Sequence, residues 1–201
     1  MKSALFALLC VCTLPVHALD ASTQVARIEQ VGKSPIEARF APGGEIRLRL
    51  CSCGVELRGV DSDKLRVAYY SDRDSTDDVR VRLDASGNHA EIRVSQCPHN
   101  NFHLTIEVPK SSDLHIRMFA GELEVNGIRG NKDVELDAGE LTMDVGDPAD
   151  YGRVEASVST GEIDASPFHV SKGGLFRSFH SNGPGKLRLH AHVGAGELEL
   201  R

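Results

Sequence analysis

The tetrapeptide Ala-Gly-Glu-Leu occurs three times in the second half of the chain, and it constrains the fold more than any other feature. The copies begin at Ala120, Ala138 and Ala195, and a related Thr-Gly-Glu-Ile begins at Thr160. Apolar residues alternate with polar ones on both sides of each glycine, but they occupy even positions before Gly121 and odd positions after it. Such alternation is typical of a half-buried β-strand, and a straight strand cannot change parity without turning its apolar face to solvent.

A bend at each glycine explains the change of parity. One extra residue at a bend restores the phase, and glycine tolerates the positive φ that such a bend often requires. Each unit is therefore predicted to be a strand, a glycine corner and a second strand, with apolar side chains inside throughout. The glutamates that follow the glycines are predicted to face solvent; they are Glu122, Glu140, Glu162 and Glu197.

Stacking of these units predicts an all-β fold, a single-domain β-solenoid or β-helix-like stack of short strands with glycine corners. The glycines are 18, 22 and 35 residues apart, and the longest gap suggests a degenerate unit around Gly183-Pro184-Gly185. The irregular spacing leaves an antiparallel β-sandwich that reuses one turn as the alternative fold. No segment has the apolar periodicity of a helix.

The N-terminus has the features of a secretory signal peptide. Residues 1–18 contain Lys2, an apolar run and the small-x-small sequence Val16-His17-Ala18, so cleavage is expected near Ala18. Lipid attachment at Cys10 or Cys12 is the alternative. The mature protein is therefore expected to be exported, to the periplasm or the cell surface, without a transmembrane segment.

The rest of the chain is expected to be one domain. Residues 19–35 are interpreted as a flexible lead-in or a capping strand, and residues 36–201 as the solenoid-like domain. The segment 55–60, Val-Glu-Leu-Arg-Gly-Val, resembles the segment 123–128, Leu-Glu-Val-Asn-Gly-Ile, so the repeated unit also occurs in the N-terminal half.

The composition is that of a soluble globular protein, with 26% charged and 40% hydrophobic residues. The net charge of −6 argues against nucleic acid and against anionic membrane surfaces as partners. Aromatic residues make up only 5% of the chain and tryptophan is absent, which argues against stacking platforms for sugars.

Three segments together resemble a known bacterial family. They are Phe40-Ala-Pro-Gly-Gly-Glu-Ile-Arg-Leu48, then Ile106-Glu-Val-Pro109, then the repeated Gly-Glu-Leu/Ile units. This pattern resembles the bacterial "putative adhesin" domain, a domain of unknown function in many exported proteins, over roughly residues 36–201. The resemblance implies a β-solenoid-like fold and an extracytoplasmic, surface-associated role, and it transfers no catalytic residue. The cysteines of this chain are not expected of the family in general.

Three cysteines, Cys51, Cys53 and Cys97, lie outside the predicted leader. In an oxidising compartment a disulfide is the expected state, and Cys97 is predicted to pair with Cys51 or with Cys53. Such a bridge would stabilise the fold by about 3–4 kcal/mol through loop closure. The alternative is a zinc or copper(I) site formed by these cysteines and His99, with His103 nearby.

The histidines and carboxylates give weaker signals. His190 and His192 are predicted to lie side by side on the outer face with no third ligand, and His169 and His180 are interpreted as isolated. No catalytic motif and no cofactor-binding motif is found. The predicted outward carboxylates could line the groove of a polysaccharide-active enzyme, or they could simply keep a β-face soluble; they are Glu122, Glu124, Asp137, Glu140, Asp144, Glu162 and Asp164.

These sequence features are compatible with three functional hypotheses. The first is an exported, non-catalytic β-repeat protein that binds an unknown protein or cell-envelope component. The second is a metal-binding or redox-responsive periplasmic protein that uses the cysteines. The third is a β-helix enzyme that acts on polysaccharides, and carboxylates that converge in one groove would favour it.

Overall fold

A computed structural model of the chain describes residues 25–99 and 101–201. The predicted leader, with Cys10 and Cys12, lies outside the described residues. Within them the fold is all-β, as predicted, with 13 strands and two short 3-10 helices, η1 (Pro148–Asp150) and η2 (Ser166–Phe168), but no α-helix. The described residues contain no helix with the length and apolar character needed to cross a membrane.

The strands are short in the N-terminal half and long in the C-terminal half. The short strands are β1 (Val25–Val31), β2 (Ile36–Arg39), β3 (Glu45–Leu50), β4 (Cys53–Val60), β5 (Lys64–Ser71), β6 (Arg80–Ser86), β7 (His89–Ser95) and β8 (Phe102–Pro109). The long strands are β9 (Asp113–Asn126), β10 (Lys132–Met143), β11 (Tyr151–Ala165), β12 (Val170–Asn182) and β13 (Leu187–Leu200). Strand β1 belongs to the segment interpreted as a lead-in or capping strand, and it pairs with β6 at an edge of the sheet.

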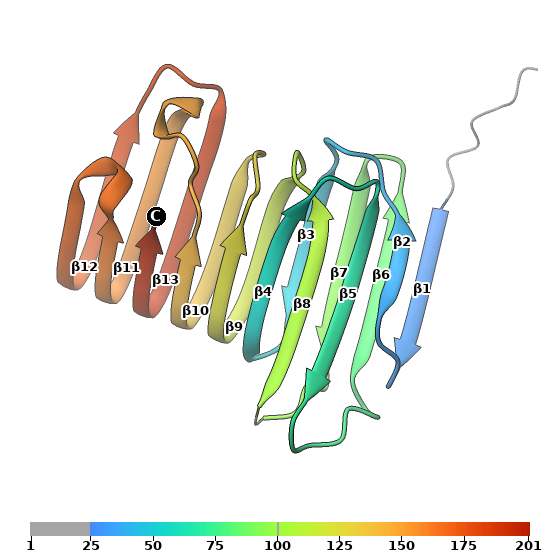
Figure 1. The fold of residues 1–201 in the computed structure, drawn as a ribbon. Coiled ribbons are helices and arrows are strands. Elements are labelled where there is room, and N and C mark those ends of the chain that lie inside the picture. The colour runs from blue at the N-terminus through green and yellow to red at the C-terminus, as the bar shows by residue number, and fades with distance from the viewer. Residues whose placement is uncertain (1–24, 100) are drawn as a thin grey trace, which may run out of the picture.

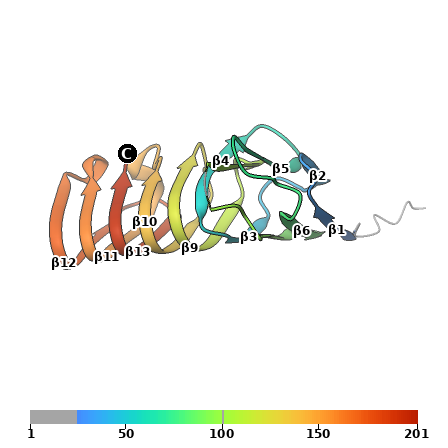
Figure 2. The ribbon, with the colours of Figure 1, turned by 90° about the horizontal axis from the view of Figure 1, so that it is seen from below.

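All strands belong to one open sheet, which divides into two branches at β9. Strand β3 pairs with β9 before Gly121, and β4 pairs with β9 from Gly121 onward. One branch continues from β3 through β7 and β6 to β1, and the other continues from β4 through β8 and β5 to β2. The two branches face each other as two layers, and the long strands curve from one layer into the other (Figures 1 and 2).

The long strands run through the glycine corners without interruption. Burial alternates on even residues before Gly121 and on odd residues after it, so the predicted change of parity is confirmed. The expectation of short strands is wrong for β9 to β13, which are 12 to 15 residues long. In β10, β11 and β13 the corner bends the strand without breaking it, because main-chain pairing with both neighbouring strands continues across the glycine.

The corner glycines stack in register. Gly139 pairs with Gly121 on one side and with Gly196 on the other, and Gly196 also pairs with Gly161. At Gly161 the main chain has φ of +139°, and a Cβ there would lie 1.7 Å from the carbonyl oxygen of Gly196. A side chain is therefore excluded both by main-chain conformation and by the neighbouring strand, which explains why the motif recurs with glycine.

The degenerate unit is β12, not the predicted Gly183-Pro184-Gly185. Gly174 of β12 pairs with Gly161 in the antiparallel ladder between β11 and β12. The segment Gly183-Pro184-Gly185 lies between β12 and β13, outside any strand. The sequence pattern failed here because β12 is an edge strand whose residues are mostly exposed, so the apolar alternation that identifies the other units is missing.

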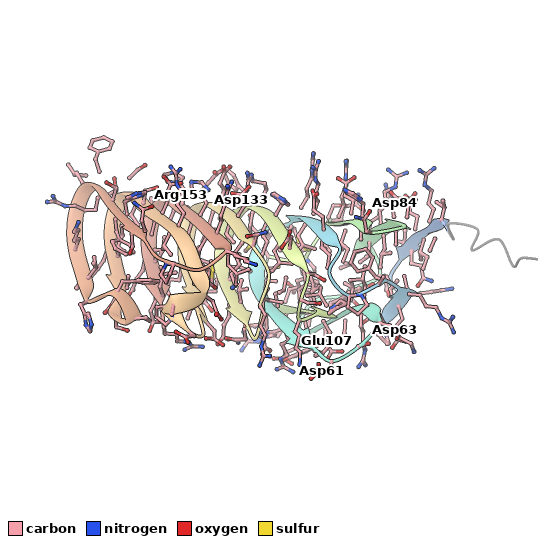
Figure 3. The ribbon with its side chains drawn as sticks, turned by 90° about the horizontal axis from the view of Figure 1, so that it is seen from above. Asp61, Asp63, Asp84, Glu107, Asp133 and Arg153 are labelled. Atoms are coloured by element: carbon pink, nitrogen blue, oxygen red, sulfur yellow. A yellow bond between two sulfur atoms is a disulfide. The ribbon has the colours of Figure 1, made fainter. Side chains whose placement is uncertain are left out.

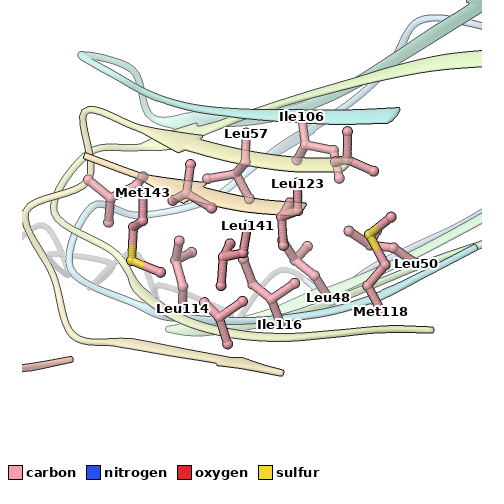
Figure 4. Packing of buried hydrophobic residues seen from close by; sticks show 14 of the residues in the cluster. Leu48, Leu50, Leu57, Ile106, Leu114, Ile116, Met118, Leu123, Leu141 and Met143 are labelled. Carbon is pink, nitrogen blue, oxygen red and sulfur yellow. The ribbon is translucent and has the colours of Figure 1, made fainter. Parts of the chain in front are cut away.

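A single cluster of buried apolar side chains runs from Ile36 to Leu200 between the two layers. Figure 4 shows its centre, where Leu57 and Leu123 of one layer face Leu114 and Ile116 of the other. The predicted likeness between residues 55–60 and 123–128 corresponds to direct pairing, because Val55 lies opposite Leu123 on the parallel strands β4 and β9.

Candidate functional site

The first corner of the stack contains cysteines in place of glycine. A disulfide joins Cys51, which follows β3, to Cys97, which follows the parallel neighbour β7. Cys53 pairs with Gly121 and so occupies the corner position of β4. It is a free thiol, with its Sγ 3.8 Å from the Sγ of Cys51.

The free thiol of Cys53 is a poor nucleophile and a poor metal ligand in this setting. Burial raises the pKa of Cys53 to about 12, so the thiol stays protonated at neutral pH. The three cysteine sulfurs lie within 4.8 Å of one another, as the metal hypothesis requires, but the group does not include His99. His103, also considered, stacks instead on Tyr70 with a centroid distance of 4.9 Å. With the bridge formed, Cys53 is the only cysteine of this group that could offer a thiolate.

Glutamates form a continuous row on the outer face of one layer. Glu122 lies opposite Glu140, Glu140 opposite Glu197, and Glu197 opposite Glu162. Neighbouring strands are about 4.8 Å apart, so the main-chain positions that carry these exposed carboxylates repeat at that spacing. Among the described residues none of the four has an ion-pair partner.

The glutamate row borders a shallow groove along the corners. Glycines from the corners of β10 to β13 make its floor, and Glu140, Glu162 and Glu197 line it. The predicted outward position of these carboxylates is confirmed, since all three are exposed. Carboxylates thus gather in one groove, which is the arrangement expected by the enzyme hypothesis, but no aromatic side chain of the described residues lines it.

The outer face of the opposite layer carries a row in which imidazoles and carboxylates alternate. Asp133 of β10 lies between His115 of β9 and His190 of β13, in register with both. The Nδ1 atoms of the two histidines are 3.1 Å and 2.9 Å from different oxygens of the Asp133 carboxylate. Figure 3 shows Asp133 and Arg153 on this side of the stack and Glu107 on the other.

Asp133 is held in its ionised form. Partial burial alone would raise its pKa, but hydrogen bonds from His190, Arg117 and His115 outweigh that effect and lower the pKa of Asp133 to about 2. The Arg117 guanidinium also contacts Glu135, with its Nε 2.9 Å from a carboxylate oxygen. Arg117 therefore bridges two carboxylates at the centre of this face.

The row extends beyond His190, so the interpretation of His180 as isolated is wrong. His190 lies opposite Glu155 of β11, and the Nδ1 of His180 is 3.7 Å from Glu155. His180 is thus not isolated, and His190 has further candidate ligands around it, namely Asp133 and Glu135. The sequence alone could not reveal these contacts, because β13 inserts between β10 and β11. This insertion brings His190 beside Asp133, which is 57 positions away in the sequence.

This face also carries most of the paired arginines. Arg82, Arg93, Arg49 and Arg117 stand in consecutive strands on one row. Each has a carboxylate within ion-pair distance, in the pairs Arg82–Glu29, Arg93–Glu91, Arg49–Glu91 and Arg117–Glu135. These four arginines are therefore paired, whereas the four glutamates of the glutamate row have no ion-pair partner among the described residues.

One buried lysine, Lys132, was not predicted from the sequence. Lys132 is 1% exposed, and its Nζ donates a hydrogen bond to the Tyr151 hydroxyl at 2.5 Å, which in turn donates to the carbonyl of Val145 at 3.0 Å. Burial lowers the pKa of Lys132 to about 8, although Asp144 and Asp150 oppose the shift. The sequence signal for this burial is the period-two alternation, because position 132 is in phase with the buried residues of β10.

No family model and no curated protein matches this chain. Among solved structures, it is similar to one described as a "putative cell adhesion protein" from Clostridium sporogenes, with a TM-score of 0.52 and 10% sequence identity. The likeness covers 89% of this chain and 100% of that one. At this identity the similarity concerns the fold.

Proposed function

We propose that this chain is an exported, non-catalytic interaction module of the cell envelope, located in the periplasm or at the cell surface. The glutamate row on its outer face is the observation that carries the proposal. Like charges directly opposite each other on neighbouring strands destabilise a sheet, and the four carboxylates have no ion-pair partner among the described residues. Binding of a partner that neutralises these four carboxylates explains why the protein retains them.

The solved structure from Clostridium sporogenes supports this direction, because its description names cell adhesion and it shares the fold over most of the chain. We also propose that the C-terminal half is a β-solenoid. Its support is the parallel, in-register pairing of β9, β10, β13 and β11, each bent at a glycine. The separate short strands of the N-terminal half favour a sandwich-like arrangement there.

A binding experiment with two matched surface variants tests the proposed function. The probe is fluorescently labelled protein, added to isolated cell envelopes and to intact cells over a range of salt concentrations. The first variant replaces Glu122, Glu140, Glu162 and Glu197 by glutamine. The second, as a control on the opposite face, replaces Arg49 and Arg93 by glutamine. We expect saturable, salt-sensitive binding that the first variant loses and the second keeps.

The same samples discriminate between binding and catalysis. The reducing ends released from envelope polysaccharides are measured in parallel. A release that depends on the glutamates would favour the polysaccharide-active enzyme. Absence of saturable binding to any envelope fraction would contradict the interaction module.

A further inference from the structure

The row of histidines and carboxylates has the donor set of a transition-metal site. The ligand atoms of Asp133, Glu135 and His190 all lie within 4.8 Å of one another. They come from two neighbouring parallel strands, because Asp133 and Glu135 share one face of β10 and His190 lies directly opposite Asp133 on β13. One imidazole nitrogen and two carboxylates form a mixed set that suits zinc and its neighbours.

The closest pair of these ligands is nearly at metal-binding separation. Asp133 Oδ1 and His190 Nδ1 are 2.9 Å apart. Two ligand atoms of a tetrahedral zinc ion, each roughly 2.0–2.1 Å from the metal, lie about 3.3 Å apart. An ion could therefore replace the proton shared by Asp133 and His190 after a shift of a few tenths of an ångström, while Glu135 would need a larger side-chain rotation.

The surroundings favour a small transition ion over calcium. Calcium takes about six to eight oxygen ligands, and Asp133 and Glu135 together offer at most four. The side chains of Asp133, Glu135 and His190 are 30%, 42% and 45% exposed, so an ion can reach them directly from solvent. His115 holds the second oxygen of Asp133 at 3.1 Å and so orients it, as an outer-shell partner does in metal sites.

Arg117 is the built-in competitor for this position. Its guanidinium lies 3.1 Å from Asp133 and 2.9 Å from Glu135, and it neutralises part of the charge that would attract a metal. We propose that Asp133, Glu135 and His190 form a surface site for a divalent transition metal such as Zn²⁺, in which the ion displaces Arg117. This site is independent of the cysteines and goes beyond the proposed interaction module.

The test measures the binding of Zn²⁺ to the full-length protein, with the disulfide intact, by isothermal titration calorimetry at fixed pH. We expect one site per chain that His190→Ala and Glu135→Gln each weaken at least tenfold. Arg117→Met should tighten the site several-fold, because it removes the competing cation. His192→Ala is the matched control, since His192 stands two residues further on the same face of β13 and contacts Ser157 instead.

A second readout excludes the cysteines as the origin of the binding. Co²⁺ bound at the proposed site should give visible d–d bands without a thiolate charge-transfer band, and Cys53→Ser should leave them unchanged. Three outcomes would overturn the proposal: no binding at millimolar Zn²⁺, binding that survives His190→Ala, or equal loss in His192→Ala. The replaced histidine, glutamate and arginine side chains reach the surface and Cys53 is partly buried, so circular dichroism checks that each variant is folded.

Discussion

One residue of the repeat, Lys132, places a charged side chain in the apolar core. Lys132 takes an inward position on β10, where the equivalent residues of the parallel neighbours are Leu114 and Leu189. Its ammonium group meets the Tyr151 hydroxyl, which is itself buried. A lone buried cation costs stability because it loses its hydration, and one neutral hydrogen-bond partner compensates only part of that loss.

Replacement of Lys132 by methionine is predicted to stabilise the protein by about 1–3 kcal/mol at pH 7. The pKa of Lys132 falls from its usual 10.5 to about 8 on folding, so between these values the unfolded chain binds more protons. The stability of the natural protein should therefore rise as the pH increases from 8 to 10.5, and the advantage of Lys132→Met should shrink over the same window. Urea unfolding at a series of pH values measures both effects.

The control is Lys64→Met, because the Lys64 side chain is 53% exposed. It should change the free energy of unfolding by less than about 0.5 kcal/mol at every pH. A Lys132→Met protein that is less stable at pH 7 would mean that the hydrogen bond to Tyr151 outweighs the cost of burying the charge.

At the scale of the element, the glycine corner is what lets one strand serve both layers. The main chain turns through a positive φ, and the neighbouring carbonyl fills the space that a side chain would need. At Gly121, Gly139, Gly161 and Gly196 a Cβ would lie 1.7–2.2 Å from a carbonyl oxygen of one neighbouring strand. The restriction is weaker at Gly174 of the edge strand β12, where the nearest atom to a Cβ would be in the Arg177 side chain, 3.0 Å away.

Gly161→Ala is predicted to destabilise the protein by about 3 kcal/mol or more, since it adds main-chain strain to a clash with the Gly196 carbonyl. Gly173→Ala is the matched control, because a Cβ at Gly173 would meet nothing within 4 Å. Chemical denaturation of the two variants gives the difference. Equal destabilisation by both would show that the corner relaxes easily, and the account of the repeated glycine would then be wrong.

The exposed edge of β12 is covered by two of its own side chains. Lys172 donates to the carbonyl of Ser178 at 3.0 Å, and Arg177 donates to the carbonyl of Gly173 at 2.9 Å. Charged side chains on an edge strand oppose pairing with another molecule. Leu175 and Phe176 lie between them, 62% and 83% exposed, so the uncovered edge would be apolar as well as unpaired.

The variant Lys172→Ala/Arg177→Ala is therefore predicted to self-associate, with a larger weight-average sedimentation coefficient at high concentration. Arg73→Ala/Lys186→Ala removes the same charge from exposed loops and should have the same sedimentation coefficient as the natural protein. If both variants associate equally, the lost net charge rather than the uncovered edge is the cause.

For the molecule as a whole, the two halves connect their layers by different means. In the C-terminal half the bent strands themselves cross from layer to layer. In the N-terminal half β3 and β4 are separate strands, and the chain crosses at Cys51 and Ser52. The disulfide between Cys51 and Cys97 links this crossing to the end of β7, so it strengthens the half that lacks continuous corners.

Removal of the bridge in Cys51→Ala/Cys97→Ala is predicted to lower the free energy of unfolding by about 4 kcal/mol, from the loop-closure entropy of a 46-residue separation. Hydrogen exchange should show the loss of protection first in β3 and β7. Cys53→Ala, which leaves the bridge intact, is the comparison and should have a much smaller effect. A double variant as stable as the natural protein would show that packing alone holds this half.

Much of the local structure of this protein follows from its sequence pattern. Period-two alternation and its change of parity at Gly121, Gly139, Gly161 and Gly196 indicated the strands, the corners and the outward glutamates, because side-chain direction in a strand is a local property. The same parity predicted that His190 faces outward. The predicted leader, export and domain boundaries remain predictions.

The contacts between distant residues depend on how the strands are ordered in the folded sheet. The insertion of β13 between β10 and β11 placed His190 beside Asp133. The parallel pairing of β3 with β7 brought Cys97 to Cys51 as its disulfide partner. Pairing between strands distant in sequence depends on the packing of the whole core, and no local pattern encodes it. The degenerate strand β12 was hidden for a related reason, because an edge strand buries little and so leaves little apolar pattern to detect.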